Sequence, residues 1–287
     1  MEQDKMLAII GSSGSGKTVT AIKLAQSLAL MKKNVVVVFC DPFTPVIPFV
    51  LPANTSHGIS LGSLLTAPAI TQKQILNACI PVKESQYISV LGYQSGENLL
   101  KYPKILREKV VDCLVSLRHL ADYIILDCAS VFEADITSLT AIETADIILY
   151  LASANLKGVS YYQSHAMMLA DQRFHLQKRL MAIGNQKVGQ DWETAGELYG
   201  GVQAVFPYIT EMEQQENELS LFHQLTDPNS CTYQQALNQI LKEAFSLEKE
   251  NDGMTAKRIK NKRSETKENQ MKEKKSFQSM FRRKGEF

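Results

Sequence analysis

The sequence predicts an α/β fold, with a doubly wound and mainly parallel sheet flanked by helices. Strand-like and helix-like segments alternate from the N-terminus to about residue 246. The strand-like segments are continuous apolar runs, such as VVVVF at residues 35–39, which is typical of parallel strands covered on both faces. A glycine-rich loop separates the first strand from the first helix, where doubly wound sheets bind their ligands.

The elements can be assigned in chain order. A buried strand is expected over residues 6–10, followed by a helix over 20–31 whose apolar side carries Ile22, Leu24, Ala25 and Leu28. Apolar residues recur at helical spacing over 104–120 and predict an amphipathic helix there. Further strands are expected at 35–39, 87–91, 123–126, 147–151, 179–183 and 201–206.

A change in composition near residue 247 divides the chain. Residues 1–247 are long enough to bury a substantial core and are expected to form one domain. Residues 248–275 are almost wholly charged or polar, and we expect a disordered linker there. Residues 248–287 hold 13 Lys/Arg and 7 Asp/Glu, whereas the whole chain carries a net charge of +1. The preceding body is therefore mildly acidic, which argues against a nucleic-acid surface.

The cysteines and the apolar segments indicate a cytoplasmic protein. The five cysteines form no C-x-x-C pair, and their apolar surroundings predict reduced core residues. The N-terminal apolar run is too short for a signal peptide, and no apolar stretch reaches the ~20 residues that span a bilayer. The five histidines show no metal-ligand spacing.

Residues 11–18 read GSSGSGKT, a complete G-x-x-x-x-G-K-[ST] phosphate-binding loop. Its glycines let the backbone curl until N–H groups point inward, where they and the helix N-terminus cradle phosphate oxygens. Lys17 is expected to reach the β- and γ-phosphates, and the Thr18 hydroxyl to hold Mg²⁺. The alternative is a Gly/Ser turn that binds nothing, which the strand–loop–helix context disfavours. Nucleotide contacts are expected from Gly11, Ser12, Ser13, Gly14, Ser15, Gly16, Lys17, Thr18 and Thr20.

Two acidic residues follow predicted strands, where open α/β sheets collect ligands. Asp127 fits the second Mg²⁺ partner, acting through a metal-bound water, and its alternative role is to cap a strand end or the next helix. Asp41 is expected near the phosphates if its strand neighbours the first one, and it would orient the attacking water. A turn-forming Asp before Pro42 is the alternative for Asp41. Lys17, Asp41 and Asp127 are thus the candidate catalytic residues.

The order of these features over residues 5–245 resembles the MinD/ParA family of dimerising P-loop ATPases. The resemblance rests on the phosphate loop, Asp41, Asp127, the segment TADIIL at 144–149 and a late Gly184-Asn185. Within this family the chain most resembles TadZ/CpaE-type ATPases, which localise pilus-assembly machinery. The resemblance implies ATP and Mg²⁺ as cofactors and places Asn185 against the adenine base. An ordinary turn Asn is the alternative for Asn185.

Three positions depart from the family pattern. Ser12 stands where the family typically has a lysine that crosses the dimer to the partner's nucleotide. Phe39 replaces the first member of an acidic pair that ends in Asp41, and no glycine follows Asp127 within residues 128–131. Loss of a cation near the γ-phosphate costs several kcal/mol of transition-state stabilisation, on the order of 3 kcal/mol. Binding of ATP is therefore expected, with slow or partner-stimulated hydrolysis.

The last segment, residues 276–287, predicts an amphipathic membrane-targeting helix. Phe277, Met280 and Phe281 share one helical face at i, i+3, i+4, and basic residues including Arg282 and Arg283 flank them. Each basic side chain near an anionic surface contributes ~1 kcal/mol. A frayed basic tail is the alternative, and contact with nucleic acid is a weaker one because stacking sites are not evident.

Three functions are compatible with these residues. The first is an ATP-dependent dimeric switch, cytoplasmic or peripheral at the inner face of the cell membrane. It would position a bacterial assembly through a pilus or secretion ATPase or a membrane platform. The second is a nucleotide-binding scaffold that does not hydrolyse, and Ser12 favours it. The third is a small-molecule kinase or ligase on the same sheet, ranked lowest because no Arg-rich lid insertion is evident.

Overall fold

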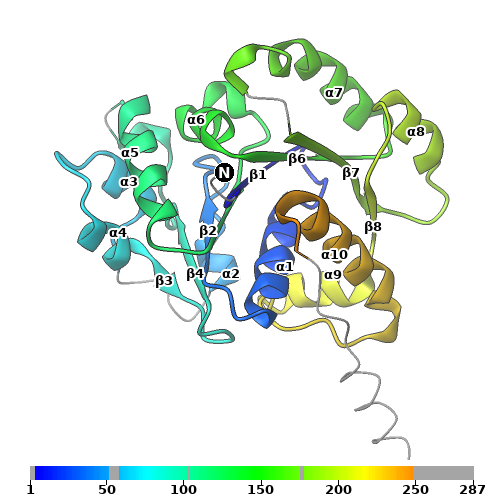
Figure 1. Cartoon of the computed structure of the whole chain (residues 1–287), viewed down its shortest axis with the longest axis horizontal. Helices are drawn as coiled ribbons and strands as arrows, with labels where there is room; N and C mark the ends of the chain where they lie inside the picture. Colours follow the sequence, from blue (N-terminus) through cyan, green and yellow to red (C-terminus); the bar gives the residue numbers. More distant parts are fainter. Residues whose placement is uncertain (1–3, 52–57, 103, 175–177, 248–287) are drawn as a thin grey trace, which may run out of the picture. The chain divides into compact units, whose positions relative to one another are not determined.

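The computed structural model describes residues 4–51, 58–102, 104–174 and 178–247. Its centre is an eight-stranded sheet in the order β3-β4-β2-β5-β1-β6-β7-β8 (Figure 1). All neighbours pair in parallel except β3 and β4, which are antiparallel. The predicted doubly wound, mainly parallel sheet is confirmed. The predicted linker at 248–275 and the segment at 276–287 lie outside the described residues.

The strands agree closely with the apolar runs that predicted them. The strand predicted at 201–206 begins only at Ala204, because Gly200 and Gly201 both adopt positive φ in a turn. Both edge strands are short and end in proline, at Pro81 and Pro207. The strands are β1 (Met6–Ile10), β2 (Val35–Phe39), β3 (Ile80–Pro81), β4 (Ile88–Gly92), β5 (Tyr123–Asp127), β6 (Ile147–Ala152), β7 (Arg179–Gln186) and β8 (Ala204–Pro207).

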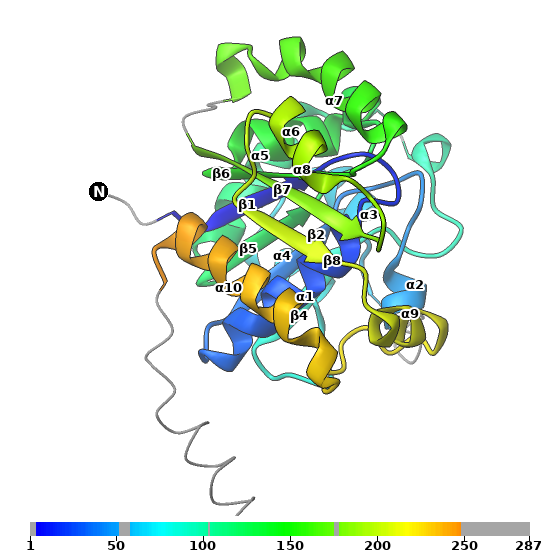
Figure 2. The same ribbon diagram turned by 90° about the vertical axis from the view of Figure 1, so that its right-hand side faces the viewer.

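The helices form a layer on each face of the sheet (Figures 1 and 2). One layer holds α1 (Lys17–Leu30), α2 (Ile47–Val50), α9 (Thr210–Asn217) and α10 (Cys231–Phe245). The other layer holds α3 (Leu61–Leu65), α4 (Gln72–Ala78), α5 (Arg107–Arg118), α6 (Ile136–Thr144), α7 (Leu156–Leu169) and α8 (Trp192–Leu198).

Each central strand supplies side chains to two cores. In β1, Leu7 and Ile9 pack into the core beneath α1 and α10, whereas Met6, Ala8 and Ile10 pack into the opposite core. Successive side chains of a strand point to opposite faces, so a strand buried on both sides must be apolar at every position. This requirement explains why these strands were visible in the sequence as unbroken apolar runs.

Two helix boundaries and one group of side chains differ from expectation. The first helix begins at Lys17 rather than at residue 20, because it starts directly from the loop residue Gly16. The helix predicted over 104–120 is shorter, Arg107–Arg118. The cysteines are not all core residues: three are buried, Cys79 is half-buried and Cys231 is exposed at the start of α10. Among the described residues, no helix is long and apolar enough to cross a bilayer.

Candidate nucleotide-binding site

The candidate site lies at the carboxyl edge of the central strands, where the loops after β1, β2 and β5 meet. The strand order places β5 between β1 and β2, so the condition attached to Asp41, that its strand neighbours the first one, is not met. Asp127 is paired in register with Ile9 on one side and Phe39 on the other. It therefore occupies the centre of this edge, and Asp41 approaches the same space from the next strand.

The phosphate loop has the tight backbone that its glycines predict. Gly16 adopts φ +89° immediately before α1, a left-handed conformation that residues with a Cβ rarely adopt. A Cβ on Gly11 would lie 2.1 Å from the Leu151 carbonyl oxygen, so only glycine fits between the loop and β6. The Ser15 hydroxyl is buried without a hydrogen-bond partner among the described residues. The loop thus combines a tight turn with a buried polar group that a bound anion would satisfy.

Lys17 lies over this loop and uses all three of its ammonium donors. Its Nζ donates to the Gly11 carbonyl at 3.1 Å, the Ser12 carbonyl at 3.3 Å and the Ser130 hydroxyl at 2.7 Å. Burial lowers the pKa of Lys17, while the carboxylates of Asp127 and Asp41 oppose that shift. Phosphate oxygens are charged acceptors and would compete favourably with these neutral ones.

Thr18 and Asp127 form the candidate Mg²⁺ site. The Thr18 hydroxyl donates to Asp127 Oδ2 at 2.6 Å, and the buried Oδ1 has no hydrogen-bond partner among the described residues. Burial raises the pKa of Asp127 to about 6, against the opposing effects of Lys17 and Thr18. A hydroxyl oxygen beside a carboxylate with an unpartnered oxygen suits Mg²⁺, which takes one or two protein ligands and keeps several waters. The residues present therefore fit the metal.

Asp41 has a structural role and also faces the site. Its Oδ1 accepts from the backbone N–H groups of Phe43 at 2.8 Å and Thr44 at 3.2 Å, and its Oδ2 accepts from the Thr44 hydroxyl at 2.9 Å. These bonds form the turn that the alternative interpretation predicted. Asp41 nevertheless lines the same cavity as Lys17 and Thr18.

A cavity of about 220 Å³ brings these groups together. Its other lining residues include Ser130 and Glu216, which the sequence analysis did not single out. Ser130 follows Asp127 by three positions and could have been noticed for its hydroxyl. Glu216 reaches the site because α9 is hydrogen-bonded to α1 through Gln215 and Lys23, a long-range contact without a local sequence signal.

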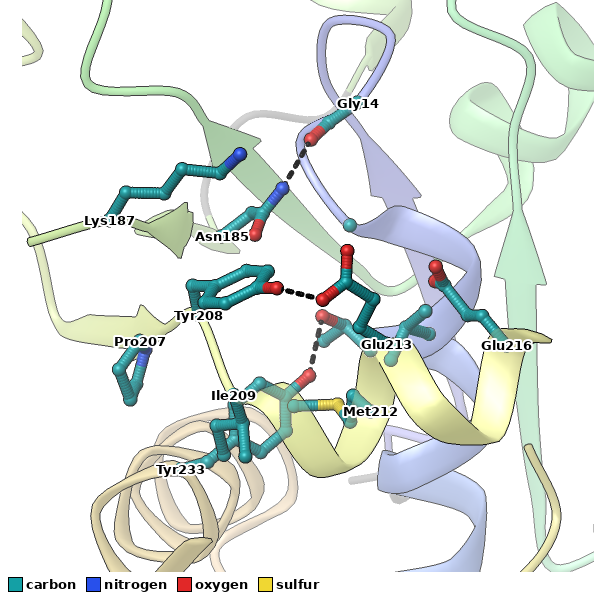
Figure 3. Close-up of a pocket in the computed structure, with 13 residues that line it drawn as sticks. Gly14, Asn185, Lys187, Pro207, Tyr208, Ile209, Met212, Glu213, Glu216 and Tyr233 are labelled. Atoms are coloured by element: carbon teal, nitrogen blue, oxygen red, sulfur yellow. Dashed lines mark hydrogen bonds between the residues drawn. The ribbon is translucent and has the colours of Figure 1, made fainter. Parts of the chain in front are cut away.

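A second cavity, of about 310 Å³, adjoins the loop (Figure 3). Asn185, at φ +50°, donates from Nδ2 to the Gly14 carbonyl at 3.2 Å. The Thr20 hydroxyl lies 3.1 Å from the Tyr233 hydroxyl, so Thr20 lines this cavity through a paired group. The remaining wall combines apolar and polar side chains, and comprises Gly14, Gly16, Val19, Lys187, Pro207, Tyr208, Ile209, Met212, Glu213 and Glu216. Such a mixture suits a flat base and a ribose.

Ser12 points into its own subunit. Its side chain is 9% exposed, and its Oγ lies 3.3 Å from the Ser153 Oγ at the end of β6. Among the described residues that line the 220 Å³ cavity, Lys17 is the one cation.

The chain matches the family described as the CobQ/CobB/MinD/ParA nucleotide binding domain over residues 6–280. No curated protein sequence matches it. Similar solved folds include a ParA family ATPase from Chlorobium tepidum (13% identity, TM-score 0.69, 83% of this chain and 98% of that one). A second is MinD of Pyrococcus horikoshii with Mg-ADP (17% identity, TM-score 0.65, 83% of this chain and 95% of that one). A third is a putative plasmid partition protein of Borrelia burgdorferi bound to AMPPNP (17% identity, TM-score 0.64, 83% of this chain and 99% of that one).

At these identities the solved structures show a shared fold, and the family match covers nearly the whole chain. Taken with the loop and the buried Asp127, these findings assign the chain: it belongs to the CobQ/CobB/MinD/ParA family of nucleotide-binding domains.

Proposed function

We propose that this protein is an ATP-dependent switch that binds MgATP, pairs with a second copy of itself and hydrolyses ATP slowly or when a partner stimulates it. The observation that carries the proposal is the convergence of Lys17, Thr18 and Asp127 on one cavity at the end of the phosphate loop. A Mg-ADP complex and an AMPPNP complex are known for proteins of similar fold, which supports a nucleoside polyphosphate with Mg²⁺.

In this proposal each residue of the site has a separate role in binding MgATP. Lys17 would exchange its contacts with the Gly11 and Ser12 carbonyls for phosphate oxygens. Thr18 would hold Mg²⁺ directly and Asp127 would hold it through a bound water, and the metal when bound would neutralise phosphate charge. Asp41, which follows β2, the strand next to β5, would orient the attacking water. Asn185 would contact the base in the adjoining cavity, beside the loop residue Gly14.

Pairing with a second copy is supported by exposed apolar side chains beside the cavity. Phe43 lies between the lining residues Asp41 and Thr44 and is 48% exposed, and Val131 follows the lining residue Ser130 and is 50% exposed. Phe49 of the nearby α2 is 61% exposed. Apolar surface around a charged site would be covered if two copies met with their carboxyl edges together.

A non-hydrolysing scaffold is the second candidate, and Ser12 is the observation that favours it. Serine has no positive charge, so Ser12, which contacts Ser153, would offer no cation to a partner's nucleotide at this position. Hydrolysis then needs a positive charge from another protein, as GTPases receive from an arginine finger.

Titration calorimetry with the full chain tests the proposal. MgATP and Mg-AMPPNP should bind with dissociation constants on the order of 1–10 μM, because a phosphate-binding loop of this kind contributes several charged hydrogen bonds. Lys17→Ala should weaken both at least about tenfold, and Lys157→Ala, on exposed α7, serves as the control. Wild-type protein that takes up neither nucleotide would refute the proposal. A molar mass that doubles with AMPPNP and not with ADP supports nucleotide-dependent pairing. Phosphate release in a single-turnover assay that disappears in Lys17→Ala supports the switch over the scaffold.

The machinery that the switch serves is proposed from the resemblance to TadZ/CpaE-type ATPases. In this proposal the protein localises a pilus or secretion assembly at the membrane. Phe277, Met280, Phe281, Arg282 and Arg283 would contact the lipid surface, and a weak helix of this kind would bind stably only as a pair.

A further inference from the structure

Two cysteines are neighbours at the carboxyl edge of the sheet, each next in sequence to a candidate catalytic carboxylate. Cys40 follows the last residue of β2, and Cys128 follows the last residue of β5. The Cys40 N–H donates to the Asp127 carbonyl at 2.9 Å. This bond continues the parallel pairing of the two strands by one residue beyond Phe39 and Asp127. Cys40 and Cys128 therefore lie opposite each other across the two strand ends.

The side chains of Cys40 and Cys128 share one face of the sheet. Both belong to the core beneath α5 and α6, and they are 0% and 2% exposed. Adjacent strands lie about 4.8 Å apart, and a disulfide joins residues whose Cα atoms are about 4.4–6.8 Å apart. A side-chain hydrogen bond with Cys128, together with burial, raises the pKa of Cys40, so the two thiols are in contact. A bond between the sulfurs thus requires only local movement.

Cys128 also gives small molecules a route to this pair. It lines the 220 Å³ cavity of the candidate nucleotide site, together with Asp41 and Asp127. An oxidant as small as hydrogen peroxide that enters this cavity can reach Cys128, whereas a bound nucleotide would occupy the same space. Oxidation of the pair should therefore respond to whether the site is filled.

We propose that Cys40 and Cys128 are a modification site, a redox pair that closes reversibly to a disulfide and thereby weakens nucleotide binding. As the S–S bond forms, each thiol gives up one proton and one electron. Hydrogen peroxide takes up the two electrons and two protons, its O–O bond breaks, and two water molecules leave. A dithiol reductant reverses the reaction by thiol–disulfide exchange and is itself oxidised to a disulfide.

The disulfide would act on the site through the backbone. Asp41 directly follows Cys40, and Asp127, which accepts the 2.6 Å hydrogen bond from Thr18, directly precedes Cys128. Drawing the two strand ends together would move both carboxylates relative to the phosphate loop. In preorganised sites a misplacement of about 1 Å can cost about a hundredfold in rate. This consequence rests on the proposed function, whereas formation of the disulfide does not.

Peptide mapping of the full chain tests the pairing. Diamide accepts the same two electrons and two protons from a thiol pair, and after treatment a peptide that joins Cys40 to Cys128 should appear. Three of the five thiols should remain free, and dithiothreitol should restore all five. Mg-AMPPNP at ten times its dissociation constant should slow the reaction about tenfold, since about one site in eleven stays empty. Five free thiols after treatment, or a disulfide between other cysteines, would overturn the inference.

Calorimetry with Mg-AMPPNP measures the effect on binding. Oxidised wild type should bind about tenfold more weakly than reduced wild type, and dithiothreitol should restore the affinity. Cys40→Ala should bind equally well before and after diamide treatment. Cys113→Ala is the matched control, because Cys113 is a buried thiol of α5 that lines a small apolar cavity with Cys40, and this variant should keep the full response.

The two measurements separate the possible failures. A mapped disulfide that leaves the affinity for AMPPNP unchanged would overturn the regulatory role and leave the proposed function intact. Reduced wild type that binds no nucleotide would refute the proposed function and the effect on binding, whereas a mapped disulfide would still support the modification site.

Discussion

At the scale of single residues, Asp127 carries a conflict between stability and function. Its carboxylate is buried, one of its oxygens has no hydrogen-bond partner among the described residues, and burial raises its pKa to about 6. A buried charge with incomplete pairing destabilises the folded state. The same unpartnered oxygen is what makes the site suitable for a hydrated metal ion.

Asp127→Asn should therefore stabilise the nucleotide-free protein and weaken metal-dependent binding. At pH 8 the free energy of unfolding of the variant should exceed that of wild type by about 1–3 kcal/mol, because the native pKa of Asp127 is raised from 3.8 to about 6. Mg²⁺ should no longer strengthen ADP binding in the variant. Chemical denaturation and calorimetry with and without EDTA measure the two effects, and Asp112→Asn on the exposed side of α5 is the control.

The pH dependence of this gain has a definite sign. A carboxyl group whose native pKa is raised contributes stability that is fully present below its unfolded value, here 3.8, and lost as the pH rises through about 6. Wild type and Asp127→Asn should thus have similar stability near pH 4 and diverge between pH 4 and 7. A difference that stays constant over this range would contradict the raised pKa.

The sequence predicted the central residues of the site but not all of its walls. Lys17, Thr18 and Asp127 follow from local rules, since each stands at a fixed place relative to a strand or a helix start. Glu216 depends on how α9 packs beside α1, and no local spacing encodes that packing, whereas Ser130 stands three residues after Asp127 and was overlooked. Asp41 was expected beside the first strand and instead reaches the cavity from beyond β5.

At the scale of elements, α1 is hydrogen-bonded to α9 and to the segment that follows α9. Lys23, only 2% exposed, donates from Nζ to Gln215 Oε1 at 2.7 Å and to the carbonyls of Leu221 at 2.7 Å and His223 at 2.8 Å. Gln26 adds a bond to the Phe222 carbonyl. Since α1 begins at the phosphate loop and α9 lines both cavities, these bonds hold the two sides of the site together.

Lys23→Met should change how stability depends on pH. Burial lowers the pKa of Lys23 to about 7, whereas Glu211 opposes the shift. A group with a lowered native pKa contributes stability that is present above the unfolded pKa of 10.5 and lost as the pH falls through about 7. The free energy of unfolding of wild type should therefore rise relative to that of the variant between pH 7 and 9. The gain is at most ~1.4 kcal/mol per pH unit. Urea unfolding at pH 7, 8 and 9 measures it, with exposed Lys157→Met as control. Parallel curves for wild type and Lys23→Met would contradict the shift.

The elements best predicted from sequence were those whose burial is complete. Strands such as β1 and β2 are apolar at every position, so their limits are visible without any knowledge of neighbours. Only α1 and α5 had been given bounds from the sequence, so even long helices such as α7 and α10 had none. For α2, α3 and α4, four to seven residues are too few to show a helical period. Their capping residues, such as Thr71 before α4 and Gln74 in its first turn, are the local signals that were available.

At the scale of the whole molecule, the proposal requires membrane attachment through residues 276–287. Full-length protein with ATP should pellet with anionic vesicles at least about threefold more than with ADP, because two tails bind where one is too weak. A chain that ends at Lys275 should stay in the supernatant with either nucleotide. Charge reversal of Arg282 and Arg283 to glutamate provides a full-length control, and unchanged pelleting after truncation would disprove the membrane helix.

The two ends of the sheet restrict how copies can associate. The outermost strands β3 and β8 have two and four residues, and each finishes in a proline that has no N–H to offer an incoming chain. Extension of the sheet from one molecule into the next is therefore disfavoured, and so is the edge-to-edge aggregation to which long open strands are prone. The proposed pairing is therefore expected at the loops of the carboxyl edge, where bound nucleotide would control it.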